Sequence, residues 1–255
     1  MENSSSIIAA PGIQPHQIVS REAWIKAHTQ HRERELELTR FREKISQERR
    51  DLPWVQITEN YVFDGPGGQV SLADLFDGRS QLFVYHFMFD PAWEEGCTGC
   101  SFVADHVDDS RIHFEQADLS FAAISRAPIE KLEAFKKRMG WTFNWVSSFH
   151  NNFNYDFHVS YRQEDLDKGP VYHDFKMRNI RSKEHPAASI FIKDEAGNIY
   201  HTFSTFSRGV EILLGAFNFL DWVPKGRNEP GDIMAWVKHH DKYNNANDAA
   251  KTCCH

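Results

Sequence analysis

The chain has 255 residues and a formal net charge of -7, with 29 Lys and Arg against 36 Asp and Glu. Hydrophobic residues make up 41% and aromatic residues 13%, so the chain can bury a core and is not disordered throughout. The acidic balance argues against a nucleic-acid partner, which requires a basic face. No window approaches the ~18 unbroken apolar residues of a membrane span, so no membrane association is expected.

The N-terminal part is predicted to be a flexible tail over residues 1–19 and a helical arm over residues 20–52. Ser20 is a suitable N-cap, and the helix is expected to end before Pro53. A narrow seam repeats every seven residues along the arm, at Trp24, His31, Leu38 and Ile45. The seam either packs against the chain's own domain or forms a homodimer, and the sequence leaves both alternatives open.

The region 53–245 is predicted to be one domain in which strands and helices alternate. Strands are predicted over residues 61–63, 81–89, 119–125, 141–147, 189–193 and 199–203, and helices over residues 101–115, 128–139 and 210–219. Residues 165–185 have no clear period and are interpreted as an insertion, and residues 233–243 as a last amphipathic segment. This order predicts an α/β sheet with helices on both faces. Residues 246–255 are predicted to be a second flexible tail.

Four cysteines are too few for a disulfide scaffold in a chain of this length. Residues 1–15 lack the basic and apolar regions of a secretory signal, so a cytoplasmic location is expected. In that compartment a Cys-x-x-Cys motif indicates redox chemistry or metal binding. The central pair is Cys97 and Cys100, and a second pair, Cys253 and Cys254, precedes His255.

Cys97 and Cys100 follow a predicted buried strand and a loop, and they open a predicted helix. Unpaired backbone N–H groups and the helix dipole stabilise a thiolate at such a position. Cys97 is therefore expected to attack a disulfide, and Cys100, on the same helical edge, to resolve the mixed disulfide. The alternative is a pair of inert, partly buried thiols.

This strand, Cys-x-x-Cys and helix arrangement resembles the thioredoxin-like superfamily. The chain more closely resembles a thioredoxin-like domain-of-unknown-function family, whose members are labelled predicted dithiol–disulfide oxidoreductases or isomerases. The blocks that carry the resemblance cover most of the chain and include Glu48-Arg49-Arg50-Asp51-Leu52-Pro53-Trp54, Tyr85-His86-Phe87-Met88-Phe89, Glu95-Gly96-Cys97-Thr98-Gly99-Cys100 and His201-Thr202-Phe203-Ser204-Thr205-Phe206. The resemblance implies a thioredoxin-like sheet and thiol redox activity, and it names no substrate.

Two motifs of related families differ from this sequence. Peroxiredoxins carry Pro-x-x-x-Thr/Ser-x-x-Cys, whereas here Glu94 stands three residues before Cys97 and Pro91 six residues before it. A peroxidase of that type is therefore not expected. Thioredoxins also place a cis-proline opposite the disulfide, and Pro186 is the nearest candidate in this chain.

The histidines support a second hypothesis. His86 lies on the strand that leads to the cysteines, so it could lie beneath them as a proton shuttle or metal ligand; the alternative is a hydrogen-bonded core histidine. A site of Cys97, Cys100 and His86 would suit copper(I) or zinc(II), which makes a metal carrier or metal-dependent redox enzyme the second hypothesis. His158 is a further candidate ligand. The cluster Cys253-Cys254-His255 could bind a metal or reduce the central pair, or it is an incidental tail.

Three more residues are candidates for substrate binding. Arg126 follows the predicted strand 119–125, at the end where open α/β sheets bind ligands. Arg208 follows the predicted hairpin, and either arginine could hold an anionic substrate or stabilise the Cys97 thiolate; surface ion pairs are the alternative. Trp141 belongs to an aromatic cluster that is either core or pocket wall.

The leading hypothesis is a cytoplasmic thiol–disulfide oxidoreductase that acts on a protein or small-molecule thiol or disulfide. It requires no cofactor. Cys97, Cys100 and His86 would be its catalytic residues.

Overall fold

The computed structural model describes residues 7–8, 13, 15–229 and 231–243. Its contacts divide the chain into two compact units. The first unit is Met1–Pro53 with Ala216–Asn228, and the second is Trp54–Gly215 with Glu229–His255. The second unit contains the sheet and the central cysteines.

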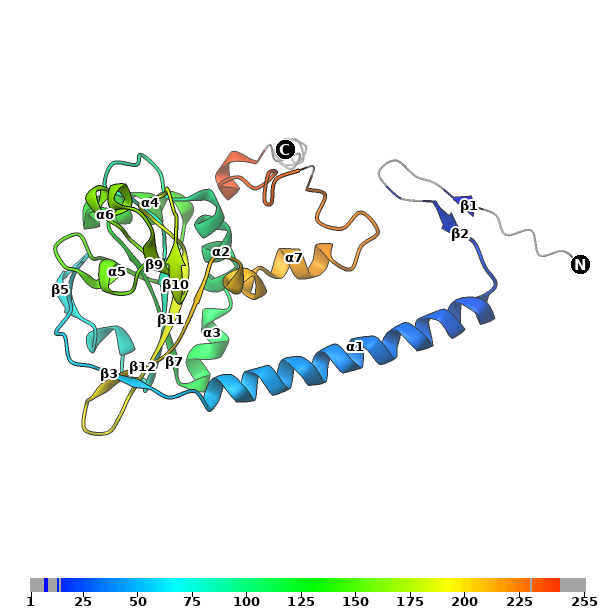
Figure 1. Ribbon diagram of the computed structural model, residues 1–255, viewed down its shortest axis with the longest axis horizontal. Helices are drawn as coiled ribbons and strands as arrows, with labels where there is room; N and C mark the ends of the chain where they lie inside the picture. The colour runs from blue at the N-terminus through cyan, green and yellow to red at the C-terminus, as the bar shows by residue number, and fades with distance from the viewer. Residues whose placement is uncertain (1–6, 9–12, 14, 230, 244–255) are drawn as a thin grey trace, which may run out of the picture. The chain divides into compact units, whose positions relative to one another are not determined.

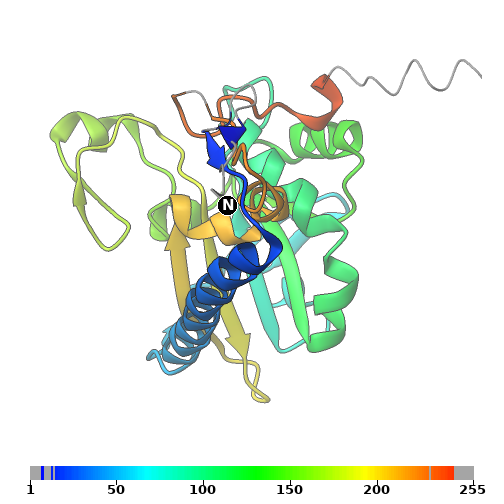
Figure 2. The same cartoon turned by 90° about the vertical axis from the view of Figure 1, so that its right-hand side faces the viewer.

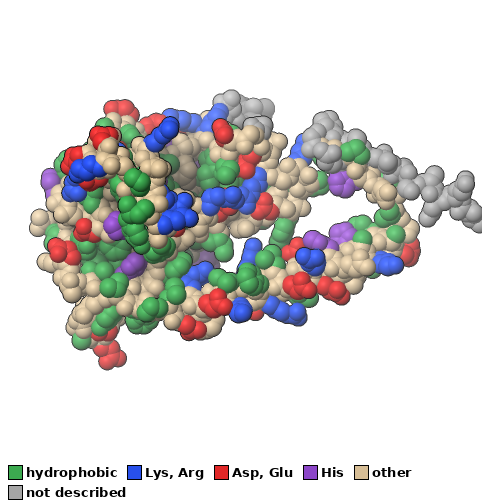
Figure 3. Space-filling model, in the orientation of Figure 1, with side chains coloured by type: hydrophobic (Ala, Val, Ile, Leu, Met, Phe, Trp, Pro, Cys, Tyr) green, Lys and Arg blue, Asp and Glu red, His purple; other side chains and the backbone are tan. Residues whose placement is uncertain are grey.

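The first unit is dominated by one long helix, α1 (Arg21–Arg50). Its N-cap is Ser20, whose hydroxyl accepts a hydrogen bond from the Ala23 N–H at 3.3 Å. No residue of α1 is buried, and side chains of both charge signs follow one another along it (Figure 3). The helix thus begins and ends where the sequence predicts. This unit also contains the strand pair β1 (Ile7–Ile8) and β2 (His16–Gln17) and most of α7 (Gly215–Leu220).

The second unit is built on a sheet with the strand order β3-β12-β11-β6-β7-β8-β4-β5 (Figure 1). Strands β6, β7 and β8 are parallel, while β11 is antiparallel to both β6 and β12. The turn of the β11–β12 hairpin projects at the lower end of the sheet in Figure 1 and Figure 2. The strands are β3 (Val55–Ile57), β4 (Val62–Gly65), β5 (Gly68–Ser71), β6 (Gln81–His86), β7 (Leu119–Ser125), β8 (Asn144–Ser147), β11 (Ala187–Lys193) and β12 (Ile199–Phe206).

The core order β12-β11-β6-β7, with a helix joining the parallel pair β6 and β7, is the thioredoxin-like arrangement. The fold class predicted from the sequence is therefore confirmed. The remaining elements are η1 (Asp74–Phe76), α2 (Thr98–Asp108), α3 (Arg111–Phe114), η2 (Glu115–Ala117), α4 (Ile129–Met139), α5 (Phe153–Asp156), α6 (Gln163–Lys168), β9 (Val171–His173), β10 (Lys176–Arg178), η3 (Ser207–Leu213) and η4 (His240–Lys242). None of the described helices has the length and apolar content needed to cross a membrane.

Each face of the sheet buries its own core. On the face that carries α2 and α4, the Phe135 ring packs against Phe89 and Trp145, with centroids 5.5 and 6.3 Å apart. On the opposite face, Phe153 of α5 packs against His86 at 5.6 Å. The second core also contains the buried residues Tyr61, Phe63, Leu72, Leu75, Phe76, Leu82, Val84, Ala122, Ile124, Val146 and Phe191. The two cores are separate because successive strand residues point to opposite faces.

The strand predicted over residues 81–89 is shorter in the structure and ends at His86. The reason lies in the backbone of Met88, whose carbonyl accepts a hydrogen bond from Cys97 N at 3.1 Å. The Met88 N–H donates to Cys100 Sγ at 3.4 Å. Both polar groups of Met88 are thus directed to the cysteine turn instead of a neighbouring strand.

Two helix predictions also differ from the structure. The helix predicted from residue 101 begins at Thr98, because Ser101 N already bonds Cys97 O at 2.9 Å. The helix predicted over residues 210–219 is the 3-10 segment η3 followed by α7, with Leu214 between them. In the segment 233–243, the structure forms the 3-10 turn η4.

Candidate active site

The two central cysteines lie at the start of α2, immediately after the loop that leaves β6. Cys97 is the N-cap of α2, and Cys100 lies in its first turn. The Cys97 carbonyl accepts hydrogen bonds from the backbone N–H and the hydroxyl of Ser101, both at 2.9 Å. The backbone N–H groups of Gly99 and Cys100, in the first turn of α2, are directed to the Cys97 thiol.

The two thiols differ in exposure and in acidity. Both are free thiols; Cys97 is partly exposed, whereas Cys100 is buried with 1% of its surface accessible. Hydrogen bonds from the Cys100 thiol and from the backbone N–H groups of Cys100 and Gly99 lower the pKa of Cys97, against the opposing effect of burial. Burial and the neighbouring Cys97 raise the pKa of Cys100. Cys97 is thus the more acidic thiol of the pair and Cys100 the less acidic one.

The loop before Cys97 is held by close packing. A Cβ atom on Gly96 would lie 2.7 Å from the Phe87 ring and 3.0 Å from the Phe135 ring, so only glycine fits there. The Gly96 carbonyl also lies 2.9 Å from Nε2 of the buried His239. These contacts hold the loop before Cys97 against α4 and against the C-terminal segment.

The cysteines line a cavity of about 270 Å³. Pro186 and Arg208, two residues singled out from the sequence, lie in the same lining. Pro186 thus faces the cysteines as predicted. The cis peptide bond expected there is not found, since the described backbone contains none.

The prediction that His86 lies beneath the cysteines is wrong. Tyr85 lines the cysteine cavity and hydrogen bonds to Cys100. His86 follows Tyr85 in β6 and therefore points to the opposite face of the sheet. There its Nε2 lies 2.8 Å from Ser189 Oγ, and its ring stacks on Phe153. Burial lowers the pKa of His86 to about 3, so it is a neutral core histidine and contacts neither thiol.

His86 belongs to a buried chain of hydrogen bonds. Ser189 Oγ lies 2.8 Å from Ser204 Oγ, which lies 2.7 Å from Nε2 of His201. Buried polar groups are stable when they satisfy one another in this way. The chain satisfies Nε2 of His86, whereas Nδ1 of the same ring is buried without a hydrogen-bond partner.

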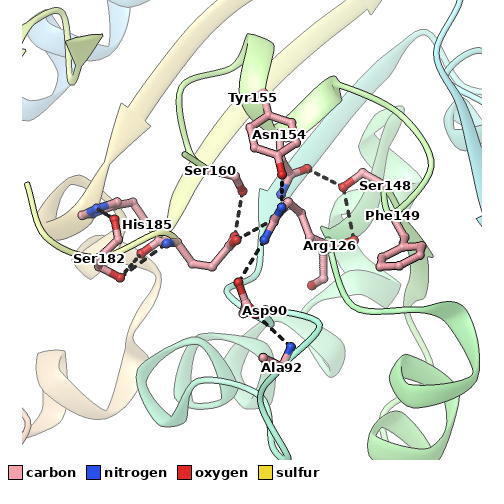
Figure 4. A network of polar contacts seen from close by, with 12 residues as sticks. Asp90, Ala92, Arg126, Ser148, Phe149, Asn154, Tyr155, Ser160, Ser182 and His185 are labelled. Carbon is pink, nitrogen blue, oxygen red and sulfur yellow. Dashed lines mark hydrogen bonds and ion pairs between the residues drawn. The ribbon is translucent and has the colours of Figure 1, made fainter. Parts of the chain in front are cut away.

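Arg126 directly follows β7, as predicted, and lies in a polar network (Figure 4). It donates to Glu184 Oε1 at 2.6 Å, to Asp90 Oδ2 at 2.9 Å and to the hydroxyl of Tyr155. The second Glu184 oxygen accepts from Ser160 Oγ at 2.7 Å. Arg126 thus connects the loop that leads to Cys97 with the segment that leads to Pro186.

Glu184 was not singled out in the sequence, and no local signal identifies it. It lies in the stretch 165–185, which has no clear period, yet only 2% of its side chain is accessible. Burial raises its pKa to about 7, while Arg126 and Ser160 act in the opposite direction. It is therefore the most perturbed carboxyl of this network.

The two other predicted substrate-binding residues lie in different surroundings. The Arg208 guanidinium pairs with Glu211 at 3.0 and 3.1 Å, at the cavity beside the cysteines. Trp141 lies in the aromatic core, and its indole N–H donates to Asp105 at 2.7 Å. Trp141 does not line the cysteine cavity, so of the two alternatives for its cluster the structure places it in the core.

The metal site of Cys97, Cys100 and His86 is not assembled, because His86 points to the opposite face. Across the described ranges, no three His, Cys, Asp or Glu side chains are grouped so that they could hold a metal ion. His158 lies at a second cavity, of about 290 Å³, with His201 and Tyr61. The cluster Cys253-Cys254-His255 lies outside the described residues.

Comparison with known proteins identifies a family but no reaction. Residues 13–243 match the family described as "Bacterial protein of unknown function (DUF899)". No curated protein matches the chain.

Among solved structures, peroxiredoxin Q of Xanthomonas campestris is 13% identical with a TM-score of 0.46, over 65% of this chain and 96% of that one. The peroxidoxin BcpB of Mycobacterium tuberculosis is 15% identical with a TM-score of 0.43, over 65% and 97% of the two chains. Likenesses this distant assign no activity.

Proposed function

Because the chain belongs to the family of bacterial proteins of unknown function (DUF899), whose name assigns no reaction, we propose from the site itself that it is a thiol–disulfide oxidoreductase. The observation that carries the proposal is the difference between the two thiols. Cys97 is partly exposed with a lowered pKa, and Cys100 is a buried protonated thiol that donates a hydrogen bond to it. A nucleophilic thiolate and a second thiol within reach are what disulfide exchange requires.

The reaction proceeds in two exchanges. The Cys97 thiolate attacks one sulfur of the substrate disulfide, and the other substrate sulfur leaves as a thiolate. Cys100 then attacks Cys97 Sγ, and its proton passes to the second substrate sulfur, which leaves as a thiol. The first departing thiolate takes up a proton from water. The products are a Cys97–Cys100 disulfide and two substrate thiols, so two electrons pass from the protein to the substrate. A low-molecular-weight dithiol returns the pair to the reduced state.

His86 takes no part in these exchanges, because it lies on the other face of the sheet. The hydroxyl of Tyr85 is the polar side chain that contacts Cys100 from β6. Burial and the two cysteines raise the pKa of Tyr85. Tyr85 therefore remains a hydrogen-bond donor to the Cys100 sulfur and stabilises the thiolate that forms there during the second exchange.

The test is the intact mass of the reduced protein after reaction with bis(2-hydroxyethyl) disulfide. Cys253 and Cys254 are replaced by Ser throughout, so that every mass change belongs to the central pair. We expect the Cys97/Cys100 protein to lose two hydrogens, and the Cys100→Ser variant to accumulate one hydroxyethanethiol adduct on Cys97. The proposal is wrong if Cys97→Ser reacts as fast as the protein with both central cysteines.

The same protein, purified without chelator, tests the metal hypothesis by native mass spectrometry. One bound copper or zinc ion per chain that is lost in Cys100→Ser would replace the proposal by a metal-binding function. A metal-free mass with the Cys97–Cys100 disulfide would support the oxidoreductase.

A further inference from the structure

The cavity beside the cysteines has an apolar lining formed by elements from distant parts of the chain. Tyr85 comes from β6, Val103 from α2, and Val210 and Leu214 from η3 and its end. All four side chains are buried. The charged groups of the lining, Arg208 and Glu211, form an ion pair with each other, and 69% of the Arg208 side chain is exposed. The Glu211 side chain is 17% exposed, so the lining is apolar apart from this one ion pair.

A turn of the C-terminal segment closes one side of this cavity. Ile233 and Met234 belong to the lining. Met234 Sδ lies 3.5 Å from the position of a Cβ on Gly99, one of the two residues between the cysteines in the motif. Met234 adopts a φ of 62°, which is unfavourable for a residue with a side chain, and its N–H is held by Glu229 at 2.8 Å. The backbone is therefore constrained in a conformation that presents an apolar side chain to Cys97.

The size and chemistry of the cavity indicate what it can hold. An apolar cavity of roughly 150 Å³ is large enough for benzene. At about 270 Å³, this cavity can take an alkyl or aryl group larger than one ring. A charged group would lose its water there without finding an unpaired partner of opposite charge in the lining, which is costly.

We propose that this cavity binds the apolar group of a low-molecular-weight disulfide, so that the substrate class is alkyl or aryl disulfides. The inference rests on the thiol–disulfide activity proposed above. The apolar group R of R–S–S–R′ enters the cavity, and the Cys97 thiolate attacks the sulfur that carries R. R′S⁻ leaves to solvent, where it takes up a proton. Cys100 then displaces RS⁻ from Cys97, takes its place in the Cys97–Cys100 disulfide, and gives up its proton to RS⁻.

The test is a series of n-alkyl 2-hydroxyethyl disulfides, from ethyl to hexyl, reacted with the reduced protein that lacks Cys253 and Cys254. The disulfide bond has nearly the same intrinsic reactivity throughout, and reaction with free 2-mercaptoethanol provides the reference. Burial of a methylene contributes ~0.8 kcal/mol, which corresponds to a rate increase of up to about fourfold per carbon. We expect the second-order rate constant to rise in this way until the cavity is filled.

A rate constant that stays constant from ethyl to hexyl, or an insulin disulfide that reacts faster than the hexyl compound, overturns the inference. In the first case the proposed function stands, because disulfide exchange still occurs. Failure of every compound, bis(2-hydroxyethyl) disulfide included, contradicts the proposed function as well.

Variants of the lining test whether the dependence of the rate constant on alkyl length arises in the cavity. Met234→Ala and Ile233→Ala should each reduce the ratio of the hexyl to the ethyl rate constant, by about threefold or more for Met234. Met177→Ala is the matched control, because Met177 is an exposed methionine of β10 outside the cavity lining. A ratio corrects for the amount of folded protein, so a loss of stability does not imitate the effect. An unchanged ratio in both cavity variants contradicts the inference.

Discussion

The two faces of the central sheet differ in how they treat a titratable side chain. One face favours the charged form of a cysteine, and the other keeps a histidine neutral. On one face Cys97 is partly exposed beside a cavity, and its surroundings lower its pKa so that the reactive form is favoured. On the other face His86 is buried, bonded to Ser189, and kept neutral. Tyr85 and His86 are adjacent in β6, and the alternation of the strand separates them. Proximity in sequence to a reactive motif therefore does not make a residue part of its site.

We therefore expect side chains on the cysteine face to affect the rate of disulfide exchange and side chains on the histidine face to affect the stability of the fold. The Arg126 network lies at the strand ends, and it joins Asp90 of the loop before the cysteines to Tyr155 of α5. Four measurements test whether the two faces have these separate roles.

The largest decrease in the free energy of unfolding is expected for Arg126→Met. It leaves Glu184 as a buried carboxylate without its cationic partner, and the loss of one member of a buried ion pair costs about 3–5 kcal/mol. Urea unfolding at pH 8, above the pKa of about 7 that Glu184 has beside Arg126, measures this free energy. The double variant Arg126→Met with Glu184→Gln should recover part of it. A loss below about 1 kcal/mol would show that the network contributes no more than an exposed ion pair.

The second effect is a pH dependence that arises from Glu184. Its pKa is raised from 4.5 to about 7, so the folded protein holds this proton more tightly than the unfolded chain. The stabilisation is complete below about pH 4.5 and is lost as the pH rises through about 7, with a size on the order of 3 kcal/mol. The difference in unfolding free energy between the parent protein and Glu184→Gln, measured from pH 4.5 to 8, isolates this residue. A difference that does not vary with pH would contradict the prediction.

The third effect tests the histidine face directly. His86→Asn removes the ring that stacks on Phe153 and alters the bond to Ser189, which should lower the unfolding free energy by about 1–3 kcal/mol. The rate of disulfide exchange by the folded protein should change by less than about twofold, because the ring does not contact either thiol. A tenfold or greater loss of rate in the folded variant would break the separation of the two faces.

The smallest effect is a change in the pKa of Cys97 when its neighbour Cys100 is replaced. Cys100→Ala removes the thiol that donates to Cys97, so the pKa of Cys97 should rise toward that of an ordinary thiol. Cys100→Ser keeps a hydroxyl donor and should raise it less. The pH dependence of iodoacetamide alkylation, without Cys253 and Cys254, gives both values. Equal reactivity of all three proteins at pH 7 would show that the backbone N–H groups alone lower this pKa.

The sequence predicts features whose causes lie within a few residues. The arm helix follows from the N-cap Ser20, a stretch without Gly or Pro, and Pro53 after its end, and its observed bounds agree. The strand over residues 119–125 is continuous and apolar, and it has those bounds in the structure. The position of Cys97 at a helix N-terminus follows from the strand, loop and motif order, and the structure places it at the N-cap.

Predictions that depend on other elements were less successful. The placement of His86 beneath the cysteines was wrong because it requires knowledge of which face of β6 receives α2. Glu184 was missed because its partner Arg126 is distant in sequence, and its own surroundings contain no repeating pattern. The turn with Ile233 and Met234 is shaped by a left-handed residue and by a side-chain contact from Glu229, which no pattern in the sequence predicts.

The amino-acid sequence alone therefore specifies the reactive motif, the alternation of strands and helices in an α/β sheet, and the long N-terminal helix. These depend on hydrophobic periodicity, helix caps and turns, which act over short distances along the chain. Tertiary structure decides which groups meet the two thiols. It brings Tyr85, Pro186, Leu214 and Met234 to one cavity and turns His86 away from it, because packing of the sheet against its helices selects one face for each side chain.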